Sequence, residues 1–312
     1  MKFKEIAPSQ KLLKNNTPKQ SSTLISDVIA LIKLRVLIAN VLPVFVGFWL
    51  ALYFNNRSFA EHWGLFLLTM AGGTFIMAGA LILNNWYDAD IDKVMDRTKG
   101  RPTVTGNFSL KAVLNAGIAT SVIGFILLLF TTLEASLYGV IGWFTYVVLY
   151  SMWSKRRYTL NTVIGSVSGA VTPMIGWAAI DTAIHPVPIV LFLLLFIWQI
   201  PHTFAIAIKK YDEYKAAGVA MLPVVHGMAI TKRQMLIYIT CLLPLPFLLY
   251  PLGIVFIVIS SLLTIGWIVL CVRGFFIEDN WKWAHMNFLY SVNYLNILFI
   301  LMVILTLPLF GN

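Results

Sequence analysis

The chain has 312 residues, of which 59% are hydrophobic and only 12% charged, and its formal net charge is +10. This composition excludes an ordinary soluble domain. Apolar runs of about 18 or more residues recur along the chain, which is the signature of membrane-spanning helices. The bases lie in short loops between these runs, so they indicate membrane topology and not nucleic-acid binding. The sequence predicts an all-α integral membrane protein.

Residues 1–26 are polar and basic, and we expect a disordered cytoplasmic arm at the membrane surface. The apolar run after Arg35 continues past any plausible cleavage site, so it is the first spanning helix and not a signal peptide. We expect residues 27–312 to form a single transmembrane domain.

Window length predicts about nine spans. With the N-terminus in the cytoplasm, this arrangement places 22 of the 23 Lys and Arg residues on the cytoplasmic side, with Arg57 as the exception. An odd number of spans places Asn312 outside the cell membrane. The approximate cores of the spans are 36–54, 63–83, 112–130, 137–153, 162–180, 187–206, 235–252, 254–272 and 288–307.

A charged segment follows the second span. Asn84, Asp88, Asp92 and Asp96 recur every four residues, which on an α-helix would place all four on one face. Stacked carboxylates repel one another unless a cation lies between them, and oxygen ligands beside a phosphate-bearing substrate suit Mg²⁺. The alternative is a solvated charged loop between two helices.

A second acidic segment, residues 209–218, follows the sixth span and includes Asp212 and Glu213. Its place suggests an internal duplication of a four-helix unit, which would bring the two acidic segments to one cavity on the cytoplasmic side. Such a cavity suits a substrate with a diphosphate head and an apolar tail. Aromatic faces could stabilise an allylic carbocation; the candidates are Trp86, Tyr87, Trp153, Tyr211 and Tyr214.

Several sequence blocks occur together in a fixed order. The motif Asn84-x-x-x-Asp88-x-x-x-Asp92 resembles the first aspartate-rich motif of the UbiA superfamily of intramembrane prenyltransferases. The resemblance continues with Lys155-Arg156-Arg157-Tyr158-Thr159. Two further blocks resemble the haem-farnesylating branch of that superfamily: Trp198-Gln199-Ile200-Pro201-His202 and Met221-Leu222-Pro223. The resemblance runs from about residue 84 to 227, and the flanking spans fit the family's nine-helix layout.

This resemblance implies transfer of farnesyl from farnesyl diphosphate to a vinyl group of protohaem IX, giving haem O, with Mg²⁺ as the metal. It implies that Asn84, Asp88 and Asp92 hold metal and diphosphate. The second motif departs from the superfamily pattern because Ala216 stands four residues after Asp212, so we expect Asp212, with Glu213, at a second metal site.

The resemblance also implies substrate contacts. We expect Arg97 and Arg101 on phosphate oxygens. His202 is expected as an axial ligand of the haem iron, and the alternative is a structural hydrogen-bonding role near the end of its helix. Phosphate or a haem propionate is expected at Lys155, Arg156 and Arg157, with Lys209 and Tyr211 as further substrate contacts.

Three alternatives remain open at this point. A prenyltransferase acting on an aromatic quinone precursor would share the first motif. A transporter would carry charges at the centres of its spans, which are nearly free of charge here. A non-catalytic haem carrier would need haem contacts without the aspartates. The partners expected beyond the substrates are membrane lipid and, for delivery of haem O, haem A synthase or a terminal oxidase, with no nucleic acid.

Overall fold

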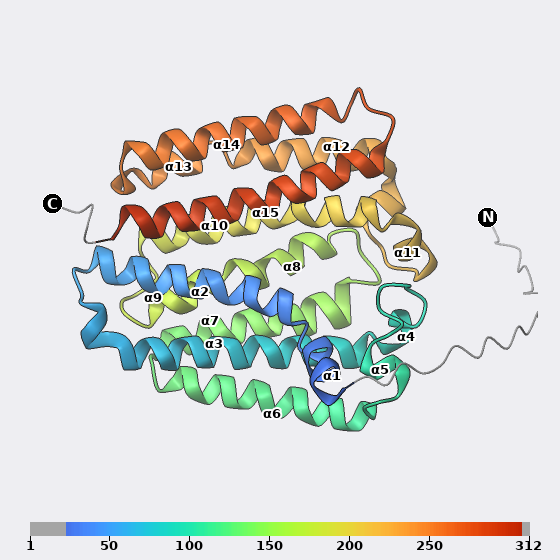
Figure 1. Ribbon diagram of the computed structural model, residues 1–312, viewed down its shortest axis with the longest axis horizontal. Coiled ribbons are helices and arrows are strands. Elements are labelled where there is room, and N and C mark those ends of the chain that lie inside the picture. Colours follow the sequence, from blue (N-terminus) through green and yellow to red (C-terminus); the bar gives the residue numbers. More distant parts are fainter. Residues whose placement is uncertain (1–22, 308–312) are drawn as a thin grey trace, which may run out of the picture.

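The computed structural model describes residues 23–307, and this part of the chain is helical without a β-strand (Figure 1). Residues 1–22 of the expected disordered arm, 1–26, lie outside the described residues. Its last three residues, 24–26, instead begin helix α1. The expected outer position of Asn312 also falls outside the described residues.

The first half of the bundle contains three long helices and several short ones. Helix α7 continues directly as η1, a π-helical segment, and the two together form one candidate membrane span. The elements are α1 (Leu24–Leu31), α2 (Leu34–Phe54), α3 (Phe59–Tyr87), α4 (Ala89–Asp92), α5 (Pro102–Thr105), α6 (Leu110–Leu129), α7 (Leu133–Phe144), η1 (Thr145–Ser154), α8 (Asn161–Ala170) and α9 (Thr172–Ala178).

The second half is built around α10 and α15, which lie side by side (Figure 1). Trp267 and Trp283 are fully buried between its helices. The elements are α10 (Pro186–Lys209), α11 (Tyr211–Ala216), α12 (Leu222–Cys241), α13 (Leu245–Leu248), η2 (Tyr250–Leu252), α14 (Ile254–Arg273) and α15 (Asn280–Leu305).

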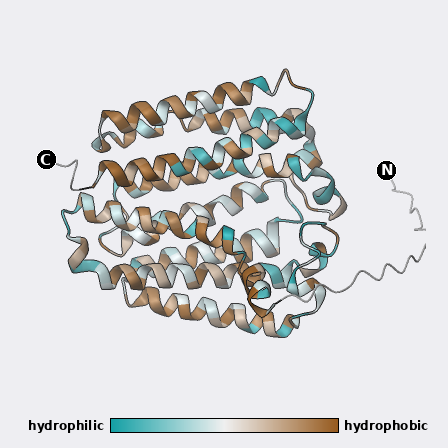
Figure 2. Cartoon of the chain, viewed as in Figure 1, coloured by the Kyte–Doolittle hydropathy of each residue, from teal (hydrophilic) through white to brown (hydrophobic). Residues whose placement is uncertain are grey.

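Within residues 23–307, seven helical segments are long and apolar enough to cross a membrane. The expected count of nine spans is therefore not confirmed. The region of the fifth expected span, 162–180, is broken at Val171 into α8 and α9, and each is too short to span alone. The region of the seventh, 235–252, starts at the end of α12 and continues through α13 and η2, so no single helix covers it. Figure 2 shows the apolar residues concentrated along the long helices.

Two close helix crossings hold the first half together. A Cβ atom on Gly176 of α9 would lie 1.9 Å from the carbonyl oxygen of Val44 in α2. A Cβ on Gly124 of α6 would lie 2.2 Å from the backbone nitrogen of Ile76 in α3. Only glycine permits these approaches, as expected where small residues let transmembrane backbones meet.

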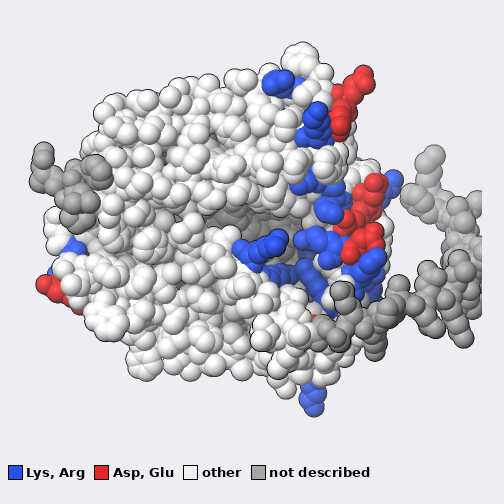
Figure 3. All heavy atoms as spheres, viewed as in Figure 1, with Lys and Arg blue, Asp and Glu red and all other residues white. Residues whose placement is uncertain are grey.

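Helix α3 is the element that positions the candidate site. Its 29 residues correspond to about 43 Å, which exceeds the roughly 30 Å hydrocarbon thickness of a bilayer. The polar end of α3 therefore emerges from the apolar layer. Figure 3 shows Lys and Arg side chains gathered at the same end of the bundle. We call this end, which carries the C-terminus of α3, α4 and α11, the charged end.

Candidate active site

Asn84 and Asp88 lie one turn apart at the charged end of α3, and both are buried. The Asn84 amide donates to Asp88 Oδ2 at 2.8 Å and to Ser151 Oγ of η1 at 2.9 Å. The prediction that Asn84 and Asp88 lie on the same face of a helix is confirmed. Asn84 thereby joins α3 to the π-helical segment, whose wider turns redirect side chains and often occur at functional sites.

Asp88 is 1% exposed and pairs with Lys155, directly after η1. Its second oxygen, Oδ1, lies 3.8 Å from Arg156 Nη2 and has no hydrogen-bond partner among the described residues. A buried carboxylate without a cationic partner would be costly, and Lys155 and Arg156 supply such partners for Asp88. The orphaned oxygen is free to accept a further ligand.

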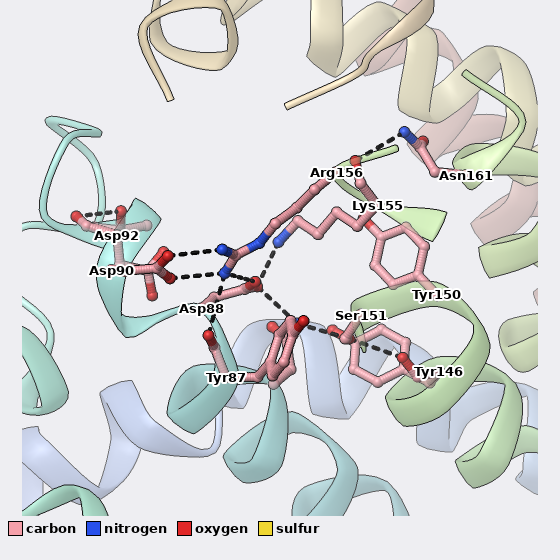
Figure 4. Close-up of polar contacts among 12 residues, drawn as sticks. Tyr87, Asp88, Asp90, Asp92, Tyr146, Tyr150, Ser151, Lys155, Arg156 and Asn161 are labelled. Atoms are coloured by element: carbon pink, nitrogen blue, oxygen red, sulfur yellow. Dashed lines mark hydrogen bonds and ion pairs between the residues drawn. The ribbon is translucent and has the colours of Figure 1, made fainter. Parts of the chain in front are cut away.

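Arg156 is oriented chiefly by Asp90, a residue outside the four-residue repeat. The guanidinium forms two hydrogen bonds with the Asp90 carboxylate, at 2.6 and 2.7 Å, and one with the carbonyl of Tyr87 at 3.2 Å (Figure 4). These hydrogen bonds hold the pKa of the Asp90 carboxyl below its usual value. Arg156 also lies 5.0 Å from the centre of the Tyr87 ring.

Asp92 ends the short helix α4 and is also buried. Its Oδ2 accepts a hydrogen bond from Arg101 Nη1 at 2.5 Å, and its backbone carbonyl accepts one from Thr98 Oγ1 at 2.9 Å. Asp88 and Asp92 each therefore hold a basic side chain: Lys155 and Arg101, respectively. Both basic side chains can donate hydrogen bonds to phosphate oxygens.

Asp96 departs from the predicted pattern. The side chain is 82% exposed and pairs with Lys99 at 2.8 Å. The prediction that it shares a face with the three preceding polar residues was wrong, because α3 ends at Tyr87, α4 ends at Asp92, and turns follow. The four-residue register assumed a continuous helix that the chain does not form.

Lys33 is a site residue that the sequence argument used only for topology. It begins α2 with a left-handed backbone conformation, φ 50°, and its amine donates to Asn84 Oδ1. Burial lowers the pKa of Lys33 well below its ordinary value, with Arg101 adding to the effect. Beside it, Asn85 Nδ2 donates to the carbonyl of Leu31 at 2.5 Å and ties α1 to the end of α3.

The second acidic segment lies against the first, as expected. Ile91 packs with Ala207, Val219 and Met221 from the residues around α11. Asn161 connects this region to the segment after η1, since its amide donates to the carbonyl of Ala220 at 2.9 Å. The predicted convergence of the two segments at one end of the bundle is confirmed.

Within α11 the inward carboxylate is Glu213. It pairs with Lys210 at 2.6 Å, and its Oε2 is buried without a hydrogen-bond partner among the described residues. Asp212 is exposed and makes no hydrogen bond or ion pair with the residues described. Burial raises the pKa of Tyr214, so that phenol stays neutral. Tyr211 lies 5.8 Å, ring centre to amine, from Lys215.

A mostly apolar cavity of about 240 Å³ extends below the carboxylates. Tyr146 and Tyr150 of η1 stack in its wall with ring centres 5.7 Å apart. Trp143 also lines it, whereas the expected aromatic Trp153 is exposed and packs on Tyr158. The four-residue spacing of Tyr146 and Tyr150 ahead of Lys155 was the sequence signal for these two rings. The remaining lining comes from α2, α3, α7, α8, α9 and α10, including Val36, Asn40, Ile76, Met77, Gly139, Thr162, Ile175, Gln199 and Thr203.

His202 faces α15 and is not among the residues lining this cavity. Its ring lies between those of Trp198, 4.7 Å away by ring centres, and Phe288, 5.2 Å away. Its Nδ1 is 2.7 Å from Ser291 Oγ, an arrangement that fixes the ring as partners of metal-ligating histidines do. Of the other expected contacts, Arg97 and Arg157 are exposed and form no ion pair with the described residues.

The donor set fits Mg²⁺. No group of three or more His, Cys, Asp and Glu side chains gathers into a metal cage within residues 23–307. Mg²⁺ usually binds through one or two carboxylates together with substrate phosphates. Asp88 and Asp92, the orphaned Asp88 Oδ1 and the adjacent bases supply that kind of incomplete site.

The fold and the buried aspartates at the end of a transmembrane helix define an intramembrane enzyme of the prenyltransferase type. Residues 40–293 match the family model described as the UbiA prenyltransferase family, and the chain belongs to this family.

Two curated relatives are named protoheme IX farnesyltransferase. The protein from Oceanobacillus iheyensis is 57% identical over 92% of this chain and 91% of its own length. The protein from Bacillus cereus is 54% identical over 93% and 95%.

Solved structures share the fold at low sequence identity. A structure of digeranylgeranylglyceryl phosphate synthase superposes with a TM-score of 0.71 at 20% identity, covering 90% of this chain and 98% of its own. A UbiA homologue from Archaeoglobus fulgidus, bound to GPP and Mg²⁺, has a TM-score of 0.67 at 18% identity, covering 91% and 99%. At this level of identity the likeness concerns the fold.

Proposed function

We propose that this chain transfers the farnesyl group of farnesyl diphosphate to a vinyl group of protohaem IX, giving haem O. The observation that carries the proposal is the 57% and 54% identity, over more than nine-tenths of the chain, with relatives named protoheme IX farnesyltransferase. The Archaeoglobus fulgidus structure with GPP and Mg²⁺ supports a prenyl diphosphate and a divalent metal as the other participants.

The proposed reaction exchanges one bond for another. The bond between farnesyl C1 and the diphosphate oxygen breaks, and its electron pair leaves with diphosphate. The vinyl π bond of haem then forms a carbon–carbon bond to farnesyl C1. Water adds to the cation left beside the porphyrin and loses a proton, which gives a hydroxyethylfarnesyl side chain.

Asp88 and Asp92, with Asn84, hold Mg²⁺ in this proposal. Bound Mg²⁺ neutralises the diphosphate and makes it a better leaving group. Lys155 and Arg101, which the structure places on the two aspartates, then serve the phosphate oxygens that arrive with the substrate. Lys33, in contact with Asn84, is a third cation at this position.

The second acidic segment contributes a second metal site in the proposal, through Asp212 and Glu213. Glu213 is the better placed of the two, because its buried Oε2 lacks a partner. The farnesyl tail occupies the cavity below, where the faces of Tyr146 and Tyr150 stabilise the positive charge that develops at C1.

The acceptor contacts are His202, Lys209 and Tyr211, with His202 as an axial ligand of iron. The Ser291 contact at Nδ1 leaves the other ring nitrogen of His202 for the metal. Arg156 is held beside Asp88 by Asp90, and the exposed Arg97 and Arg157 serve as further phosphate contacts in the proposal.

We place the protein in the cell membrane with the N-terminus and the charged end in the cytoplasm and the C-terminus outside. The gathering of Lys and Arg at one end of the bundle supports this orientation (Figure 3). Haem A synthase or a terminal oxidase is then the natural recipient of the product.

The test is product analysis with purified protein in lipid nanodiscs supplied with haem, farnesyl diphosphate and Mg²⁺. We expect a haem with the mass of a hydroxyethylfarnesyl adduct, lost with EDTA and with Asp88→Asn, and retained with the exposed control Asp96→Asn. Prenylation of an aromatic quinone precursor instead of haem would overturn the substrate assignment. Haem binding without transfer to any acceptor would favour a haem carrier.

A further inference from the structure

A second cluster, formed by a lysine, a histidine and aromatic rings, lies at the charged ends of α10 and α15. The Lys209 amine lies 4.5 Å from the centre of the Phe288 ring and 5.9 Å from that of Trp281. Among the described residues, no carboxylate lies within ion-pair distance of Lys209. A cation that rests on two aromatic faces without a counter-ion is suited to receive an anion from outside the chain.

The first turns of α15 add polar atoms that lack partners. The His285 ring stacks on Trp281 with ring centres 5.3 Å apart and planes 14° apart. His285 Nδ1 is buried without a hydrogen-bond partner among the described residues, and so is Asn280 Oδ1. Buried polar atoms normally have partners. An orphaned nitrogen beside an unpaired cation therefore indicates that a ligand completes this cluster.

The shape of the cluster restricts the ligand. The Trp281 ring has Lys209 and His285 each within 6 Å of its centre, and Trp281 itself is 56% exposed. A flat, largely apolar ligand can lie on such a surface while an anionic group reaches the amine. A tryptophan and a lysine that only anchor the helix in the membrane interface would leave His285 Nδ1 unexplained.

The cluster lies at the charged end of the bundle, as the candidate active site does, and shares α10 with it. On α10, Gln199 and Thr203 line the cavity, and Ala207 packs against Ile91 of the turn that carries Asp92. Lys209 is the last residue of the same helix. Figure 3 shows the molecule hollowed between α15 and α2, with Lys and Arg side chains along the charged side of the hollow. Two residues apart along the helix, Lys209 faces α15 and Ala207 faces Ile91, so a ligand anchored on Lys209 is held at the same end of α10 as the aspartate-rich segment.

We propose that Lys209, Trp281 and His285 anchor a propionate carboxylate of the acceptor porphyrin. Lys209 donates a charge-assisted hydrogen bond to the carboxylate, His285 Nδ1–H donates a second, and the porphyrin edge rests on Trp281. This proposal rests on the proposed function and deepens it, because it assigns a propionate to Lys209 and adds Trp281 and His285 to the acceptor contacts.

The test compares Fe(III)-protoporphyrin IX with its dimethyl ester, which lacks both propionate charges. Wild type, Lys209→Gln, Lys209→Arg and His285→Ala are titrated in lipid nanodiscs, with the Soret band as the readout. Lys282→Gln is the matched control, since Lys282 is exposed on α15 one residue from Trp281. The KM for farnesyl diphosphate is measured in parallel.

We expect Lys209→Gln to weaken binding of the free acid about tenfold, which corresponds to one charge-assisted hydrogen bond, and to leave binding of the ester unchanged. Lys209→Arg should restore most of the affinity. His285→Ala should lose part of it for the free acid alone, and Lys282→Gln should match wild type. The KM for farnesyl diphosphate should not change.

Equal weakening for acid and ester, or no weakening of either, overturns the anchoring proposal while transfer of farnesyl to haem can still be intact. Haem binding that depends on the propionate charge, without farnesyl transfer, supports the propionate anchor and contradicts the proposed enzyme activity. The two proposals therefore fail separately.

Discussion

Arg156 and Asp90 form a two-pronged ion pair, with N–O distances of 2.6 and 2.7 Å, that joins the residues after η1 to helix α4 (Figure 4). The pair holds the guanidinium 3.8 Å from Asp88. Asp90 has no place in the four-residue pattern of the aspartate-rich segment, so its role here is to position Arg156.

We expect Asp90→Asn to lower kcat/KM for farnesyl diphosphate about three- to tenfold, because the pair is partly exposed and worth less than a buried one. Arg156→Gln should do the same, and the double variant should show little added loss. Steady-state kinetics of the three variants give the coupling. Asp96→Asn, which breaks the exposed pair with Lys99, is the control and should change nothing. Fully additive losses would mean that Asp90 acts independently of Arg156.

The roles of Glu213 and Asp212 can be distinguished by how much Mg²⁺ the variants at each position require for activity. We expect Glu213→Gln to raise the Mg²⁺ concentration for half-maximal activity about tenfold, as loss of a ligand or of its support does. Asp212→Asn should raise it less, about twofold, because the Asp212 side chain is exposed and its contact with a metal is weaker. The measurement is the initial rate as a function of Mg²⁺. The reverse order of effects would return the second metal site to Asp212.

Tyr150 offers a test of the aromatic wall of the cavity. Tyr150→Leu should lower kcat about tenfold, since it removes a ring face worth roughly 0.5–2 kcal/mol to a nearby cation. Tyr150→Phe should retain most of the rate because it keeps the ring. Tyr158→Leu, at an exposed ring packed on Trp153, is the matched control. A Phe variant as slow as the Leu variant would point to the hydroxyl instead of the ring.

The crossing of α2 and α9 should be intolerant of any side chain. Gly176→Ala places a methyl group 1.9 Å from the backbone oxygen of Val44, and backbone cannot yield as a flexible side chain does. We expect a loss of about 1–3 kcal/mol in stability, seen as a lower midpoint of thermal unfolding in detergent. Gly64→Ala, where a Cβ meets nothing within 4 Å, should be neutral or slightly stabilising. Equal midpoints would show that the helices separate at little cost.

The sequence by itself determined the class of protein and indicated where its candidate site lies. Long apolar runs are stable as helices in a bilayer. The basic residues between these runs predicted that charge would gather at one end of the bundle. The spacing of Asn84 and Asp88 is local, since both lie within one turn of α3, so the pattern of residues sufficed to bring them together. The second acidic segment was also correctly expected beside the first.

Only the tertiary structure decided which of the charged residues belong to the site. Asp96 follows the same spacing as Asp88, yet α3 ends before it, and a periodicity argument cannot detect where a helix stops. Lys33 reaches Asn84 across 51 positions of sequence, and Glu213 turns inward where Asp212 does not. Such contacts depend on how helices cross and how a π-helical turn redirects side chains. These are properties of packing between distant segments, and no local pattern encodes them.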